Sequence, residues 1–124
     1  MIDQRASMGR MSADDPLMRA RALVLHDLEA RQCADASSVS ALEESVAHRG
    51  WWLAQWPDGG EYVEGLVAQD VQDALLDKLG RWPLCTSCDL LDEHTLEIEP
   101  ELGADPHWVC PKSGIVVSPL GRLS

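Results

Sequence analysis

Two cysteines separated by two residues, Cys85 and Cys88, stand at the start of a C-terminal segment that cannot form a helix, and Cys110 follows 22 positions later. Prolines interrupt this segment too often for a helix to run through it; they are Pro83, Pro100, Pro106, Pro111 and Pro119. The segment is also too small to bury a sizeable core of its own. The sequence therefore predicts that residues 81–124 form a small module that needs a cross-link, or docking on the rest of the chain, to fold.

The cysteines and a nearby histidine have the spacing of a zinc site, Cys-x2-Cys-x18-His-x2-Cys. Zinc prefers four tetrahedral ligands drawn from thiolate and imidazole, and a two-residue gap lets one tight turn direct two side chains at a single ion. Three of the ligands are then Cys85, Cys88 and Cys110. We take His107 as the fourth, and His94, which would reach in from the first loop, as the alternative. The predicted cofactor is a structural zinc ion.

The same spacing resembles the zinc-ribbon family, whose half-sites lie on turns beside β-hairpins and whose metal replaces a hydrophobic core. The second turn of a ribbon often reads Cys-Pro-x-Cys-Gly, and the residues from Cys110 to Gly114 keep that frame with Ser113 where the second Cys belongs. The resemblance thus implies a ribbon with a degenerate second knuckle. The whole chain also resembles small uncharacterised proteins of high-GC bacteria, through its Trp-Pro-x-Cys and Trp-x-Cys-Pro-x-x-Gly segments. That resemblance implies no activity.

Other roles for the cysteines stay open. If Ser113 marks a lost ligand, the ribbon is free of metal and held by packing alone. A redox dithiol at Cys85 and Cys88 is disfavoured, because a thioredoxin-like pair opens a helix after a strand and this pair precedes the predicted strands. Two disulfides would form only in an exported protein. Cys33 is expected to act as a small hydrophobe.

The start of the chain lacks the central apolar stretch of a signal peptide. No apolar run in the sequence approaches the length needed to span a bilayer. We therefore expect a cytoplasmic protein that makes no membrane contact.

Three amphipathic helices are predicted ahead of the cysteines, over residues 16–32, 38–55 and 60–79. Asp15 and Pro16 supply an N-cap and a first-turn proline for the first helix. The second begins at Ser38, or at Ser40 in a capping box. The third follows a Pro-Asp-Gly-Gly turn and carries one apolar stripe with its acidic residues mostly off that stripe.

Beyond the third helix the pattern becomes strand-like, and three short strands are predicted over residues 95–99, 107–110 and 115–120. The predicted fold class is α+β. A three-helix bundle over residues 15–80 precedes a three-stranded, zinc-ribbon-like module over residues 81–124, which packs on it. Residues 1–14 show no periodicity and are expected to form a flexible tail.

The net charge of −11 arises entirely within residues 57–106, which hold thirteen acidic and two basic residues. Direct binding to nucleic acid is disfavoured, because counterion release rewards basic side chains. An acidic surface suits a basic partner protein, or simply keeps the protein soluble. Asp70, Asp73 and Asp77 share one side of the third predicted helix. They form a solvated face, a cation site or a partner-binding face.

Tryptophans cluster at the end of the second predicted helix, at Trp51, Trp52 and Trp56. Because Trp51 and Trp52 are adjacent, they cannot both point the same way on a helix, and we expect one to face outward or to pack on the ribbon. Two interpretations stay open. The cluster is the seam between the helices and the ribbon, or it is a binding patch, since Trp is enriched at interface hot spots.

The sequence has no Gly-rich phosphate loop, nucleophile elbow or metalloprotease motif, so we expect no enzymatic activity. The favoured function is that of a zinc-stabilised protein-interaction or adaptor protein, as part of a larger assembly. Two alternatives remain: a nucleic-acid-linked regulator whose ribbon contacts a polymerase or DNA, and an acidic mimic of nucleic acid.

Overall fold

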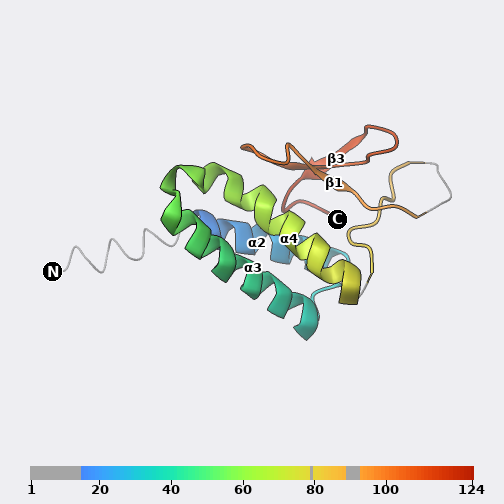
Figure 1. Ribbon diagram of the computed structural model, residues 1–124. Helices are drawn as coiled ribbons and strands as arrows, with labels where there is room; N and C mark the ends of the chain where they lie inside the picture. The colour runs from blue at the N-terminus through green and yellow to red at the C-terminus, as the bar shows by residue number, and fades with distance from the viewer. Residues whose placement is uncertain (1–14, 79, 89–92) are drawn as a thin grey trace.

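The computed structural model describes residues 15–78, 80–88 and 93–124, and the predicted tail over residues 1–14 lies outside them. Helices occupy the N-terminal part of the chain and a three-stranded sheet the C-terminal part, so the α+β prediction is confirmed (Figure 1). The elements are α2 (Pro16–Ala30), α3 (Ala36–Gln55), the 3-10 turn η1 (Pro57–Tyr62), α4 (Val63–Lys78), β1 (Glu97–Glu99), β2 (His107–Val109) and β3 (Val116–Pro119). None of the helices in the described ranges is long and apolar enough to cross a membrane.

The first two helices begin at aspartates. The Asp15 carboxylate accepts a hydrogen bond from the backbone N–H of Leu17 at 2.9 Å, and Pro16 opens α2 as predicted. The prediction that Ser38 or Ser40 caps the second helix is wrong. Asp35 caps α3, because its carboxylate accepts the backbone N–H of Ser38 at 2.8 Å and the helix already starts at the next residue.

The third predicted helix divides into two parts. The turn after Trp56 winds as η1, and the α-helix proper begins at Val63. Gly59 lies against the rings of Trp52 and Trp56, where an added Cβ would come within 2.9 Å of ring carbons. The glycine is therefore required by close packing at the turn between α3 and α4. The predicted apolar stripe is confirmed, and its buried members include Val67, Val71 and Leu75.

The sheet is antiparallel in the order β1-β2-β3 and packs on the side of the helices formed by α2 and α4, with α3 beyond them (Figure 1). Each observed strand is shorter than its predicted range but lies inside it. Side chains alternate between the two faces of a strand. Ile98 in β1 and Trp108 in β2 are buried, whereas their neighbours along each strand are exposed or half-buried.

Two glutamines of α4 join the helix to the backbone beside the sheet. The side-chain amide of Gln72 donates to the carbonyls of Leu96 at 2.9 Å and Trp82 at 3.2 Å, and that of Gln69 donates to the carbonyl of Glu101 at 2.9 Å. These bonds satisfy carbonyls that the sheet leaves unpaired. Helix and sheet therefore share one continuous core, in which Trp82 and Trp108 meet edge to face at 5.4 Å.

A buried carboxylate fixes the C-terminal residues to α2. Asp27 is fully buried and accepts hydrogen bonds from the indole of Trp108 at 2.7 Å and from the backbone N–H groups of Gly121 at 2.7 Å and Leu123 at 3.0 Å. The Nδ1 atom of the His26 imidazole lies 2.9 Å from Oδ1 of Asp27. We call these contacts the Asp27 clamp.

Candidate metal centre

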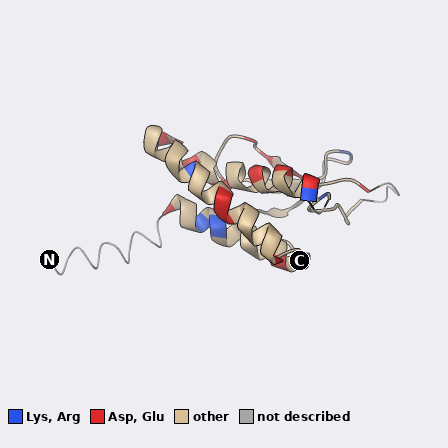
Figure 2. Ribbon diagram, turned by 60° about the horizontal axis from the view of Figure 1, so that its bottom comes forward, with Lys and Arg blue, Asp and Glu red and all other residues tan. Residues whose placement is uncertain are grey.

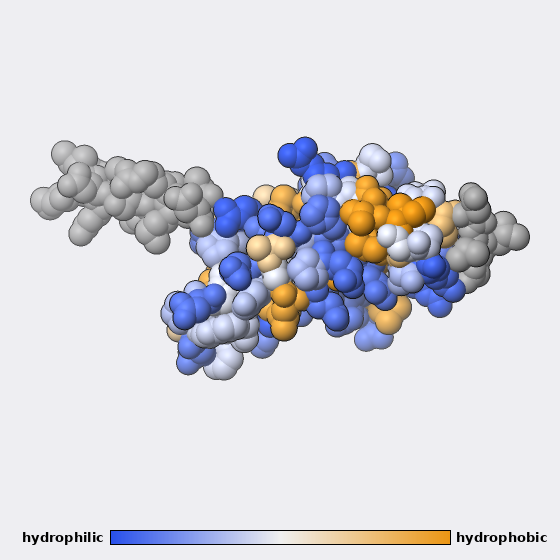
Figure 3. Space-filling view, turned by 90° about the horizontal axis from the view of Figure 1, so that it is seen from above, coloured by the Kyte–Doolittle hydropathy of each residue, from blue (hydrophilic) through white to orange (hydrophobic). Residues whose placement is uncertain are grey.

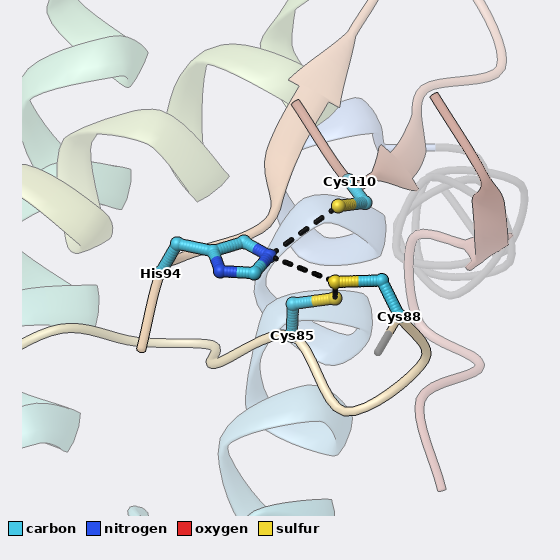
Figure 4. Close-up of side chains that lie close together, drawn as sticks. All are labelled: Cys85, Cys88, His94 and Cys110. Atoms are coloured by element: carbon cyan, nitrogen blue, oxygen red, sulfur yellow. Dashed lines mark hydrogen bonds between the residues drawn. The ribbon is translucent and has the colours of Figure 1, made fainter. Parts of the chain in front are cut away.

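Four potential metal ligands lie together at the end of the molecule where the segment 80–88 meets the sheet (Figures 1 and 4). They are Cys85, Cys88, His94 and Cys110, whose ligand atoms all lie within 4.8 Å of one another. We call this group the Cys3His cluster. Three of its contacts are short: Cys85 Sγ to Cys88 Sγ at 3.8 Å, and His94 Nε2 to the sulfurs of Cys88 and Cys110 at 3.4 Å each. A set of three thiols and one imidazole arranged in this way can bind a metal ion.

The first half of the cluster is built by two short antiparallel segments. Leu84 and Thr95 form an isolated β-bridge, and the backbone N–H of Cys85 donates to the carbonyl of His94 at 2.9 Å. This pairing brings Cys85 and His94 side by side, although they are nine positions apart in the chain. The guanidinium of Arg31, at the end of α2, donates to the carbonyl of Leu84 at 2.7 Å and anchors the pair to the helices.

The second half of the cluster is a tight turn after β2. The backbone N–H of Gly114 donates to the carbonyl of Cys110 at 2.8 Å, and Gly114 has a φ of +80°, a conformation that glycine adopts readily. Ser113 donates its backbone N–H to Cys110 Sγ at 3.3 Å, and its hydroxyl accepts the N–H of Ile115 at 3.2 Å. Ser113, which stands where a ribbon would have its second Cys, thus supports the sulfur of Cys110 and is not part of the cluster.

Hydrogen bonds at this turn favour the thiolate of Cys110. They come first from the side chain of Ser113, then from the backbone of Ser113 and Lys112 and from His94, and together they lower the pKa of Cys110 to about 5 against the opposing effect of burial. Thiolate is the form of cysteine that binds metal. The turn after β2 therefore favours the ionised form of Cys110 that can bind a metal ion.

The preference for His107 as the fourth ligand is corrected by the structure, which places His94 among the three cysteines. His107 lies three positions before Cys110 on a strand, so its side chain leaves the opposite face of the sheet. Its Nδ1 lies 2.7 Å from the carbonyl oxygen of Asp105, in the loop before β2.

Strand alternation was the signal that could have identified His94. In the segment leading into β1, His94, Leu96 and Ile98 are all buried, whereas Glu97 and Glu99 are exposed. Extending the alternating pattern back by one step from the predicted strand places His94 on the inward face, the same face of the sheet as Cys110. The spacing of the metal ligands along the chain contained no such information.

The predicted partner-binding residues are not gathered in one place. Trp51 is 64% exposed and stacks on His48, whereas Trp52 is half-buried against Trp56 and beneath the guanidinium of Arg49. One tryptophan thus faces outward, as expected. The turn from α3 through η1 lies at the end of the helical layer away from the Cys3His cluster (Figure 1). The seam between helices and sheet is formed instead by Trp82 and Trp108, so the seam interpretation of the α3 cluster is wrong.

The three aspartates of the predicted acidic face differ in their contacts. Asp70 is half-buried and forms a bidentate ion pair with Arg49, at 2.7 and 2.8 Å, while accepting the hydroxyl of Ser45 at 2.9 Å. Asp73 and Asp77 are exposed. Asp70 therefore joins α3 to α4, and only the other two present their carboxylates to solvent.

None of the four cysteines forms a disulfide in the described part of the chain, and Cys33 lies outside the Cys3His cluster. Its Sγ donates to the carbonyl of Arg31 at 3.3 Å, and burial, with the nearby charge of Asp35, raises the pKa of the Cys33 thiol. Cys33 is half-buried against the core, in line with the small hydrophobe expected from the sequence.

Comparison with curated proteins gave no match, and neither did comparison with solved structures. Comparison with protein families matched residues 13–120 to the family described as a domain of unknown function, DUF8819. The matched range includes all three helices, the sheet and every member of the Cys3His cluster. Because the match extends over most of the sequence, the chain belongs to the DUF8819 family.

Proposed function

We propose that the protein is a non-catalytic, zinc-stabilised interaction module that binds a basic partner protein. The observation that carries the proposal is the Cys3His cluster, in which three thiols and an imidazole from two separate segments converge within 4.8 Å. Such a convergence of soft donors is characteristic of structural zinc sites.

The distances within the cluster support zinc as the ion. A tetrahedral zinc with Zn–S bonds of about 2.3 Å and a Zn–N bond of about 2.0 Å has S–S edges of about 3.8 Å and S–N edges of about 3.5 Å. The observed separations are 3.8 Å between Cys85 and Cys88 and 3.4 Å from His94 to each of two sulfurs. Three of the six edges therefore already have the lengths of the required tetrahedron, and the remaining separations are at most 4.8 Å.

The composition of the cluster supports a structural role for the ion. Catalytic zinc sites keep a coordination position for water or substrate, whereas four protein ligands close the sphere. Here the ion would join the paired segments around Leu84 and Thr95 to the turn after β2, and no disulfide of the described cysteines links the two. The zinc would therefore supply cohesion that the small sheet lacks.

The surface beside the cluster supports a basic partner. Two adjoining hollows of about 260 and 220 Å³ lie between α4 and the segment that leads through β1, and both are lined by Gln72 and Glu97. Asp73 and the exposed Leu76 line the first hollow, and Glu101 lines the second. Acidic residues recur on the helices and on the segments beside them (Figure 2). The sheet side of the molecule is mostly hydrophilic, but it also carries an apolar patch that a protein partner would cover (Figure 3).

Zinc content and its dependence on single ligands test the first half of the proposal. We expect the purified protein to hold about one zinc per chain, because the cluster supplies one complete set of four ligands. Replacement of His94 by Ala should cause loss of the ion during gel filtration, whereas the matched His107→Ala variant should retain it. Elemental analysis of the eluted protein decides the matter. A zinc-free wild type, or stronger loss in His107→Ala, contradicts the assignment.

Charge reversal tests the second part of the proposal, the binding of a basic partner protein. The double variant Asp73→Lys, Glu97→Lys should lose binding to basic proteins captured from a host-cell lysate, because its substitutions lie in the groove between α4 and β1. The matched control is Glu29→Lys, Glu44→Lys, which changes net charge equally at exposed sites outside the acidic stretch. Capture by wild type and control but not by the groove variant supports the proposal. Equal capture by all three contradicts it, and capture that duplex DNA competes away indicates nucleic-acid mimicry instead.

A further inference from the structure

The four members of the Cys3His cluster differ in how open they are to solvent. Cys110 and His94 are buried, with 0% and 8% of their surfaces exposed. Cys85 and Cys88 are both half-buried, and their sulfurs lie 3.8 Å apart on one short turn. The two cluster members nearest to each other in sequence are therefore also the two that are partly exposed to solvent.

We propose that Cys85 and Cys88 are a site of reversible oxidation, at which a peroxide converts the pair to a disulfide and so releases the zinc. The zinc part of this proposal rests on the proposed function. The oxidation of the pair does not, because two thiols at this separation can form a disulfide in the metal-free protein as well.

The chemistry balances with hydrogen peroxide as the oxidant. One thiolate attacks the peroxide, an S–O bond forms, the O–O bond breaks, and the departing oxygen leaves as water after taking up a proton. The second thiolate then attacks the sulfenic sulfur, an S–S bond forms, the S–O bond breaks, and the departing hydroxide takes up a proton and leaves as a second water. The two sulfurs lose two electrons in total and one peroxide gains them. A thiol reductant reverses the reaction by thiol–disulfide exchange.

The remaining cysteines are poor competitors for the peroxide. The reactive form is the thiolate, and burial raises the pKa of the Cys33 thiol. Cys110 is fully buried, so its sulfur is shielded from solvent. Selectivity for the Cys85–Cys88 pair therefore follows from exposure and from the closeness of the second sulfur.

The structural effect of oxidation is local. A disulfide removes two of the four ligands, and His94 and Cys110 alone cannot complete a tetrahedral site. The described residues 84–88 and 93–95 then lose their metal link to the turn after β2. The hydrogen bonds of the Asp27 clamp and the contacts among the helices do not involve the cluster and stay in place, although Cys110 belongs to the buried core and Cys85 and Cys88 pack against it. Oxidation would thus loosen a third surface hollow, which Leu76, Arg81 and Leu84 line, without unfolding the protein.

The experiment treats full-length, zinc-loaded protein with increasing amounts of hydrogen peroxide. We expect zinc release, followed with a metallochromic dye, to accompany a mass loss of about 2 Da in the peptide that contains both cysteines. Dithiothreitol with added zinc should restore both readings. Cys33→Ser should respond within about twofold of the wild type, because Cys33 takes no part. Cys88→Ser should form no intramolecular disulfide and should instead gain oxygen on Cys85.

Two results would overturn the proposal: a pair that stays reduced under a tenfold excess of peroxide, or a disulfide that contains Cys33 or Cys110. If the protein binds no zinc, the proposed function fails, and peptide mapping of the metal-free chain still shows whether the pair oxidises. Retention of zinc by fully oxidised protein contradicts the release step alone. The experiment therefore distinguishes failure of the proposed zinc binding from failure of the proposed oxidation of Cys85 and Cys88.

Discussion

At the scale of single residues, the fully buried side chain of Asp27 has the densest set of hydrogen bonds described above, and it is not a member of the Cys3His cluster. The buried carboxylate of Asp27 accepts hydrogen bonds from Trp108, Gly121 and Leu123, three donors that belong to the opposite end of the chain. A buried carboxylate is costly unless donors surround it, and these donors are equally costly to leave unpaired. The sequence gives no sign of this arrangement, because nothing near position 27 distinguishes its aspartate from a surface one.

We expect Asp27→Ala to destabilise the protein by about 3 kcal/mol or more, because it leaves three buried donors without an acceptor. Asp27→Asn keeps one acceptor oxygen and should cost less. Urea unfolding followed by tryptophan fluorescence measures both, and the salt-bridged surface residue Glu43 supplies a control through Glu43→Ala, with an expected change below about 1 kcal/mol. Equal effects at positions 27 and 43 would contradict the clamp.

The thiol of Cys110 gives a prediction of pH dependence in the metal-free protein. Its pKa is about 5 in the folded chain and 9.0 ordinarily, so folding favours the thiolate. The resulting stabilisation is fully present above pH 9, declines as the pH falls, and is lost below about pH 5. We expect Ser113→Ala to raise the pKa of Cys110, because the variant loses the side-chain hydrogen bond of Ser113, which is the largest cause of the lowered pKa, and keeps only the smaller contribution of the backbone N–H.

Ultraviolet absorbance of the thiolate, titrated in the zinc-free protein, measures this shift. Subtraction of the Cys110→Ser titration isolates the one thiol. An unchanged curve in Ser113→Ala would show that the turn does not favour the thiolate.

At the scale of elements, periodicity predicted the three helices and three strands, because each buries one face against the shared core. Helix starts were less predictable. Asp35 and Ser40 are both acceptable caps in isolation, and only the path of the chain after α2 decides between them. The choice between His94 and His107 failed for a similar reason: sequence spacing fixes which residues can meet, but strand alternation and the pairing of Cys85 with His94 decide which do.

The cap of α3 is testable with a matched pair of variants. We expect Asp35→Ala to lower the free energy of unfolding by about 1 kcal/mol, since it removes the acceptor for the backbone N–H of Ser38. Ser40→Ala, at the cap position that the sequence suggested, should be close to neutral or slightly stabilising, because Ser40 is an exposed residue within the helix. Thermal unfolding followed by circular dichroism compares the two, and the reverse order would restore the capping box.

At the scale of the whole molecule, the sheet depends on the helices. Strands of three or four residues cannot form a stable sheet alone. They acquire stability from the core shared with α2 and α4, from the Asp27 clamp and, as proposed, from zinc. The size of this shared core was not predictable from the sequence, because each contributing run of apolar residues is short and none indicates its partner.

Removal of zinc should therefore loosen one end of the molecule and leave the rest folded. After treatment with a chelator we expect amide hydrogen exchange to rise in residues 84–88 and 93–95, with α2 and α4 still protected. The midpoint of thermal unfolding should fall by roughly 10 °C, as loss of a tight ligand reduces the free energy of unfolding by several kcal/mol. Uniform exchange throughout the chain would mean that the metal holds the entire fold.

The Asp27 clamp also determines when the protein can be completed during its synthesis. It joins position 27 to positions 121 and 123, which lie 94 and 96 residues further along the chain. A ribosome that adds about 5–20 residues per second needs roughly 5–20 s to reach them. The Asp27 carboxylate of the nascent α2 has none of its three final donors until Trp108 is added, 81 residues after it, and the other two donors follow only at the end of the interval. The native core is therefore completed only after all three helices have been translated.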